Sequence, residues 1–92
     1  MMNRKQILDL AEQCVCVDRD EQYGDAEDNF ALIASFWNVY KGEAIFDAED
    51  VAIMMALLKI ARIKTGNSAD SYVDLAGYAA CAGEIRGKCR NE

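Results

Sequence analysis

The sequence predicts an all-α protein, an antiparallel four-helix bundle-like domain that spans residues 1–92. Apolar residues recur at helical spacing in four segments, and the alternating pattern of a strand is absent. The glycines fall mostly between these segments, and the chain contains no proline. Because short connections join helices that run antiparallel to their neighbours, we expect a bundle.

The first helix is expected over residues 3–17, with Cys14 on its apolar face. Disulfides are rare in the cytoplasm, so we interpret the four cysteines as thiols, with Cys14 and Cys81 buried. The chain has no histidine that would complete a mixed zinc site with them. The residues at helical spacing on this face are Ile7, Leu10, Ala11, Cys14 and Val17.

The second helix is expected over residues 26–41, from an N-cap at Asp25 to a left-handed C′ residue at Gly42. It carries two apolar stripes, so we expect it to be buried on two sides. In so small a domain, a helix of this kind favours a homodimer. The first stripe contains Phe30, Ile33, Trp37 and Tyr40, and the second contains Leu32, Phe36 and Val39.

The third helix is expected over residues 48–65 as the central helix of the domain. Its segment VAIMMALLKIARI is apolar almost all round, as in helices that are buried on every side. Asp47 is the expected N-cap, and Phe46 and Val51 have the spacing of a hydrophobic staple. We expect Gly66 to end this helix.

The fourth helix is expected over residues 68–86 and is rich in small residues, which suit close helix packing or a dimer seam. The tail that begins at Gly87 is expected to fray. The small residues are Ala76, Gly77, Ala79, Ala80, Ala82 and Gly83.

The formal net charge of −6 is concentrated in the first half of the chain. Residues 1–50 hold twelve acids and four bases, whereas residues 51–92 hold four acids and six bases. The acidic half argues against free nucleic acid as a partner, because phosphate binding depends on cationic side chains. A basic host protein, a metal ion or a small phosphate is compatible. The chain has no apolar run long enough for a membrane span and no signal-peptide pattern, so we expect it in the cytoplasm.

Two acidic groups have both a structural and a functional interpretation. The stretch DRDEQYGDAEDNF, residues 18–30, is either a hard-oxygen cation site or a polar connection that ends in the Asp25 cap. The spacing of its acids does not match a calcium loop, and we favour the cap. Asp47 and Asp50 are likewise a shared metal site or, as we favour, a cap and an acid placed well for the helix dipole.

A third group lies on either side of the turn between the last two helices. Arg62 and Asp70 are each about four residues from that turn, and Lys59 and Asp74 are each about seven. Each pair is therefore expected to meet across an antiparallel hairpin. The pairs are either two ordinary ion pairs or a charged pocket, with phosphate on the cations and a metal ion or water on the carboxylates.

Several motifs resemble a family of short bacteriophage and prophage proteins of unknown function: DRDEQYGDAEDNF, IASFW, DVAIMMALLKIAR and DSYVDLAGYAA. The resemblance covers residues 7–85. The second half also resembles the phage nucleotide-modification-associated domain, and both look like relatives of the all-α nucleotide pyrophosphohydrolases of the MazG type. The MazG-type resemblance implies a helical bundle, dimeric or larger, that acts on nucleoside triphosphates with Mg²⁺.

The MazG pattern, which holds magnesium ions, is E-x-x-E on one helix and E-x-x-D on the next. The resemblance implies that Asp70 and Asp74 take the place of the second motif. Lys59 and Arg62 stand where the first is expected, and cations do not ligate magnesium. Asp50 lies about 13 Å further along the axis, so it reaches the other acids only from another subunit. An enzyme of this kind would be a nucleotide pyrophosphohydrolase without the usual magnesium cage.

Two functions are therefore predicted. In one, a homo-oligomer binds or processes a small nucleotide. In the other, a non-catalytic phage interaction protein inhibits a host enzyme or defence system through its acidic first half. For the nucleotide, the candidate residues are Lys59, Arg62 and Arg19 for phosphate, Asp70, Asp74 and Asp50 for Mg²⁺ or water, and Tyr23 for base stacking.

Overall fold

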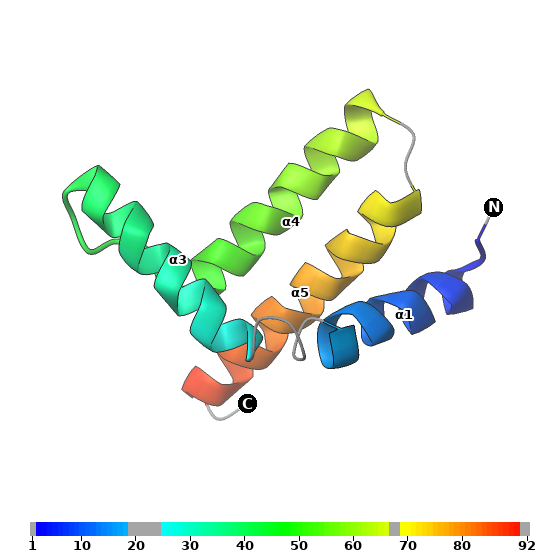
Figure 1. Ribbon diagram of the computed structural model, residues 1–92, viewed down its shortest axis with the longest axis horizontal. Coiled ribbons are helices and arrows are strands. Elements are labelled where there is room, and N and C mark those ends of the chain that lie inside the picture. The colour runs from blue at the N-terminus through cyan, green and yellow to red at the C-terminus, as the bar shows by residue number, and fades with distance from the viewer. Residues whose placement is uncertain (1, 19–24, 67–68, 91–92) are drawn as a thin grey trace.

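The computed structural model describes residues 2–18, 25–66 and 69–90, and these residues form helices and no strand (Figure 1). The all-α prediction is thus confirmed, and two of the four predicted helices have the expected bounds. The elements are α1 (Arg4–Glu12), a π-helical segment η1 (Gln13–Asp18), α3 (Ala26–Lys41), α4 (Ala48–Thr65) and α5 (Ala69–Arg90).

The helices assemble around the antiparallel pair α4 and α5, which lie side by side in Figure 1. α3 packs near the start of α4 and the end of α5, and α1 packs on α5. The arrangement is open, since the Cα radius of gyration of 13.9 Å exceeds the value of about 12 Å typical of this length. The core lies where three helices meet and contains Phe30, Ala34, Val51, Ala52, Ala82 and Ile85.

The predicted helix caps of α3 and α4 are confirmed. The carboxylate of Asp25 accepts a hydrogen bond from the Glu27 amide at 3.2 Å, and Gly42 ends α3 with a φ of 79°. Asp47 and Asp50 accept from each other's backbone amides at 2.9 and 3.0 Å. This reciprocal pair satisfies two amides that the first turn of α4 would otherwise leave without partners.

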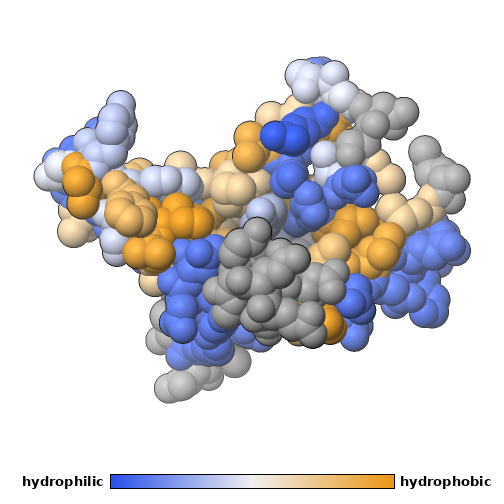
Figure 2. Space-filling model, viewed as in Figure 1, coloured by the Kyte–Doolittle hydropathy of each residue, from blue (hydrophilic) through white to orange (hydrophobic). Residues whose placement is uncertain are grey.

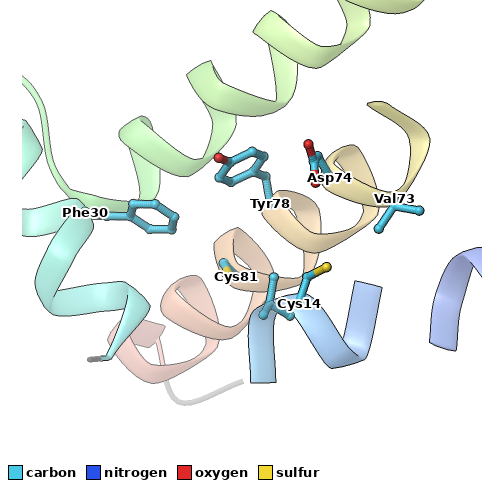
Figure 3. A pocket seen from close by; sticks show the side chains of 7 residues that line it. Cys14, Phe30, Val73, Asp74, Tyr78 and Cys81 are labelled. Atoms are coloured by element: carbon cyan, nitrogen blue, oxygen red, sulfur yellow. The ribbon is translucent and has the colours of Figure 1, made fainter. Parts of the chain in front are cut away.

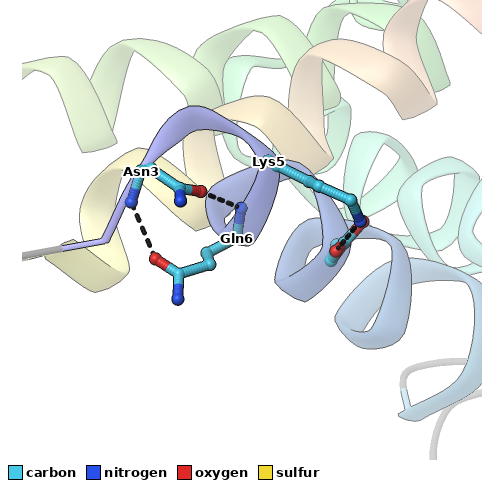
Figure 4. Close-up of polar contacts among 4 residues, drawn as sticks. Asn3, Lys5 and Gln6 are labelled. Carbon is cyan, nitrogen blue, oxygen red and sulfur yellow. Dashed lines mark hydrogen bonds and ion pairs between the residues drawn. The ribbon is translucent and has the colours of Figure 1, made fainter.

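The start of α1 uses a similar capping box, which Figure 4 shows. Asn3 Oδ1 accepts from the Gln6 amide, and Gln6 Oε1 accepts from the Asn3 amide, each at 2.8 Å. Lys5 pairs with Asp9 one turn further on, at 2.7 Å. These contacts are all local, so they set where the helix begins and not where it packs.

The end of the first helix differs from the prediction, because the α-helix stops at Glu12 and continues as η1. The longer hydrogen-bonded repeat of a π-helix changes which side chains face the core. Val15 becomes half-buried against α5, whereas Cys14 is exposed, so the predicted burial of Cys14 is wrong; Cys81 is only half-buried. A Cβ at Gly77 would lie 2.7 Å from Val15 Cγ1, so this glycine is what allows the close approach.

The end of α5 also differs from the prediction, because the helix continues beyond residue 86 to Arg90. Two ion pairs hold this end. Arg86 Nε donates to Glu49 Oε2 of α4 at 2.8 Å, and Lys88 lies 3.7 Å from Glu84 one turn back. Two of the small residues of α5 serve close packing within the chain. Gly77 lies against Val15, and Ala82 is part of the core.

Burial of α3 and α4 is one-sided within one chain, so the chain alone does not reach the two-sided burial predicted for α3 or the all-round burial predicted for α4. On α3, the first predicted stripe is buried or half-buried except for Tyr40, which is 94% exposed. The second stripe is exposed. On α4, Val51, Ala52 and Ala56 are buried, but the opposite face is open to solvent. The exposed apolar side chains there are Ile53, Met54, Leu57, Leu58 and Ile60.

The α3–α4 connection is held by one side chain, Asn38, which the sequence analysis did not single out. Its Oδ1 accepts from the amides of Ile45 at 3.0 Å and Phe46 at 2.8 Å. Its Nδ2 donates to the Phe46 carbonyl at 3.0 Å. Phe46 is thereby placed against Trp37, with ring centroids 5.7 Å apart in an edge-to-face arrangement.

We predict that Asn38→Ala lowers the free energy of unfolding by about 1–3 kcal/mol, because two loop amides and a carbonyl lose their partner. Ser35→Ala on the same helix is the control and should stay within about 0.5 kcal/mol. Urea unfolding followed by circular dichroism measures both. Equal stabilities of the two variants would show that Asn38 does not hold the connection.

Candidate functional site

The charged group between α4 and α5 contains one of the two predicted ion pairs. Lys59 Nζ lies 2.9 Å from Asp74 Oδ2. The Lys59 side chain is 15% exposed and that of Asp74 is 38% exposed, so the contact is partly shielded from water. The predicted meeting of Lys59 and Asp74 is confirmed, and it follows from their equal distance from the turn.

The second predicted pair does not form. Arg62 and Asp70 are both exposed, and no ion pair joins these two described side chains. Both residues lie in the terminal turns of their helices, where water solvates each charge well and an ion pair adds little. Arg62 thus projects a solvated guanidinium one turn beyond the Lys59–Asp74 contact.

A small cavity of about 70 Å³ lies beside Asp74, between η1, α3 and α5. Figure 3 shows the side chains around it, with the Tyr78 ring between Phe30 and Asp74 in this view. The rings of Phe30 and Tyr78 are 6.0 Å apart at 45°. Ligand pockets usually enclose about 300–1,000 Å³, so this cavity admits a few water molecules and not a nucleotide. It is lined by Cys14, Val15, Phe30, Val73, Asp74, Tyr78 and Cys81.

The three acids proposed for metal or water are not gathered by the fold of one chain. Asp50 belongs to the capping box at the start of α4, Asp74 pairs with Lys59 and Asp70 is solvated. Within the described residues, no group of three or more acidic or cysteine side chains is placed to hold a metal ion. Arg19 and Tyr23 lie outside the described residues, as do Asp20 and Glu21 of the acidic stretch.

The exposed second stripe of α3 and the exposed Tyr40 of the first stripe form a candidate interface, and we define the α3 stripe as Leu32, Phe36, Val39 and Tyr40. Val39 and Tyr40 are 79% and 94% exposed as residues, so they contribute almost nothing to the core. Figure 2 shows hydrophobic side chains gathered along α3 on the face in view. Acids lie near both ends of the stripe: Asp28 is one turn before Leu32 on α3, and Glu43 follows the C-cap Gly42 just after the helix.

A groove of about 430 Å³ runs beside α4 at the Arg86–Glu49 contact, and no sequence pattern predicted it. Arg86 is far from Glu49 and Asp50 in the sequence and meets them only because α4 and α5 are antiparallel. Its lining is mixed, with Ile45, Phe46, Ile53 and Met54 beside Glu49, Asp50 and Arg86.

We predict that Lys59→Ala lowers the free energy of unfolding by about 1–3 kcal/mol, because it leaves the partly buried Asp74 carboxylate without its cation. Arg62→Ala, a matched loss of one exposed cation, should change stability by less than about 0.5 kcal/mol. Thermal unfolding of both variants and of the exchanged pair Lys59→Asp with Asp74→Lys measures the effect. If the exchanged pair is no more stable than Lys59→Ala, the Lys59–Asp74 contact does not act as an ion pair.

Among the described residues, none of the helices combines the length and the hydrophobicity that a membrane span requires. No solved structure matches the chain.

Comparison with curated proteins identifies phage relatives. The chain is 49% identical over 74 residues to the Gene 55 protein of Mycobacterium phage L5. The matched region covers 79% of this chain and 47% of that relative. It is 42% identical over 80 residues to the Gene 55 protein of Mycobacterium phage D29. This match covers 86% of this chain and 52% of that relative. The chain thus spans about half the length of the curated relatives that it matches.

A family model gives the same assignment. Residues 6–86 match the family described as "Domain of unknown function (DUF6378)". The expected likeness to phage proteins of unknown function is confirmed, whereas the MazG-type resemblance stays a prediction. The chain therefore belongs to the DUF6378 family, which includes phage proteins and has no known function.

Proposed function

We propose that this protein is a non-catalytic phage interaction protein that binds a basic, partly apolar surface of a host protein through α3. The observation that supports this most directly is the α3 stripe with acids at both ends. An isolated exposed apolar residue is ordinary on a protein surface, but a continuous stripe with aromatic members is typical of a binding surface.

The residue types of the α3 stripe suit protein recognition. Phe36 and Tyr40 are large side chains with few rotatable bonds, and aromatic residues contribute strongly at protein interfaces. Because α3 is anchored by Phe30 and Ala34 on its other side, the stripe is presented on a rigid helix. A partner therefore binds it without first having to order a loop.

The charges around the stripe select the kind of partner. Asp28 and Glu43 at its ends are not paired within the described chain, and most of the acids of this protein lie in the same half of the sequence. A partner with cations around an apolar centre would pair with these acids. Such complementarity speeds association and excludes acidic surfaces.

We predict that a synthetic amphipathic helical peptide, with leucines on one face and lysines on the other, binds the protein and changes the fluorescence of Trp37. Trp37 is the single tryptophan, and it lies on α3. Phe36→Glu should weaken binding about tenfold or more without loss of helix content, because Phe36 is outside the core. Leu8→Glu on α1 is the matched control and should bind as the wild type does.

The same peptide with glutamates in place of lysines tests the electrostatic part and should not bind. Equal binding by wild type and Phe36→Glu would contradict the assignment to α3. Equal binding of the basic and acidic peptides would contradict the stated chemistry of the partner.

Nucleotide binding, with or without Mg²⁺, is the second candidate. The observation that favours it is the position of Arg62, a solvated guanidinium one helical turn beyond the Lys59–Asp74 ion pair. A guanidinium suits bidentate contact with phosphate. The cavity beside Asp74 is too small for a nucleotide, so binding would occur on the open surface or between subunits.

We predict for this second candidate that Arg62→Ala abolishes nucleotide binding while thermal stability is kept. Native mass spectrometry of the wild type and Arg62→Ala with nucleoside mono-, di- and triphosphates and Mg²⁺ measures this. Lys5→Ala, which removes an exposed cation on α1, is the control. If the wild type binds no nucleotide under any of these conditions, the second candidate is excluded and the interaction function stands alone.

A further inference from the structure

We propose that the exposed face of α4 binds the same face of a second copy of this chain, so that two α4 helices pack antiparallel about a two-fold axis at Leu57. This surface is separate from the α3 stripe, and the inference does not depend on the proposed function. It assigns an occupant to the apolar side chains that the fold leaves on α4.

The exposed face of α4 has the pattern of a helix–helix seam. Starting at Asp50, steps of three and four residues give Ile53, Leu57, Ile60 and Lys64 in one line along the helix. This is the spacing by which helices pair in coiled coils and bundles. Leu57 at the centre is 57% exposed, and the flanking residues Met54 and Ala61 are exposed too.

The charges of this line are complementary to a second copy in one orientation. Asp50 and Lys64 each lie seven residues from Leu57, on opposite sides of it. When two α4 helices cross antiparallel at Leu57, each Asp50 lies opposite the other copy's Lys64, and Met54 lies opposite Ile60. A two-fold axis brings the same patch of both copies together, so the patch must be complementary to itself. The line from Asp50 to Lys64 meets this requirement.

The α3 stripe lacks this property. It has acids at both ends, so antiparallel or parallel self-pairing would place like charges opposite each other. Charge thus distinguishes the two exposed apolar surfaces: α4 favours a second copy, and α3 favours a basic partner.

The exposed area supports a stable dimer. The chain exposes 6545 Å², roughly 1,200 Å² more than the approximately 5,300 Å² expected for a folded monomer of its mass. A stable protein interface buries about 800 Å² on each partner. The excess is therefore enough for one such interface, and most exposed large apolar residues lie on α3 and α4.

Sedimentation equilibrium of the full chain tests the seam. The wild type should be a dimer, and Leu57→Glu should raise the dissociation constant about 100-fold or more, because the axis places the two glutamates opposite each other. Leu8→Glu, the same change at an exposed leucine of α1, should leave it unchanged. Circular dichroism should show that Leu57→Glu keeps its helix content.

Lys64→Glu tests the charge pair at the ends of the seam. It should raise the dissociation constant about tenfold, and Lys5→Glu, the same change at an exposed lysine of α1, is the control.

Carbodiimide cross-linking tests the orientation. This reagent joins a lysine amine to a carboxylate as an amide with loss of water, without a spacer. Lys64 and Asp50 of one chain are about 21 Å apart along α4, so their amide forms only between two copies. Mixed ¹⁴N and ¹⁵N chains identify such peptides by mass.

An intermolecular Lys64–Asp50 cross-link that disappears in Leu57→Glu would support the proposal. A wild-type monomer at high micromolar concentration would overturn it. So would a dimer that survives Leu57→Glu and is lost in Phe36→Glu, because that dimer would use the α3 stripe. A wild-type monomer would leave the peptide experiment on α3 unaffected, so the failure of this proposal and the failure of the proposed function can be told apart.

Discussion

The antiparallel packing of α4 on α5 is the contact on which the rest of the structure depends. Val51 and Ala52 of α4 meet Ala82 and Ile85 of α5 in the core, and α3 adds Phe30 to that pair. The segment after α1 reaches α5 only because Gly77 has no side chain. The same packing sets the register that brings Lys59 to Asp74 and Glu49 to Arg86. Both cross-helix ion pairs are consequences of this register.

This arrangement covers only one side of α4 and one side of α3. The described residues do not surround a helix as apolar as α4, so that helix is half-covered in this structure. The protein therefore carries two apolar surfaces that its own fold does not use. Their end charges differ, and this difference separates a self-complementary surface on α4 from an acidic one on α3. Assembly and partner binding would then occupy different helices.

Local features could be predicted from the sequence, and tertiary features only in part. The caps at Asp25 and Asp47 and the left-handed Gly42 depend on residues within one turn, so pattern alone locates them. The Lys59–Asp74 contact could be predicted because a hairpin relates residues by their distance from the turn. The same reasoning failed for Arg62 and Asp70, since proximity at solvated helix ends does not make an ion pair. The π-helical segment and the exposure of Cys14 depend on how Val15 meets Gly77, and no local pattern carries that information.

The central claim is that α4 completes its packing against a second copy whereas α3 does not. Hydrogen exchange of the wild type at about 1 μM and about 100 μM tests it directly, since dimerisation adds stability by mass action to the segments it covers. We expect exchange across residues 50–64 to slow markedly at the higher concentration, while exchange across residues 32–40 changes much less. Exchange that is independent of concentration in both segments, or that slows only in α3, would contradict the account.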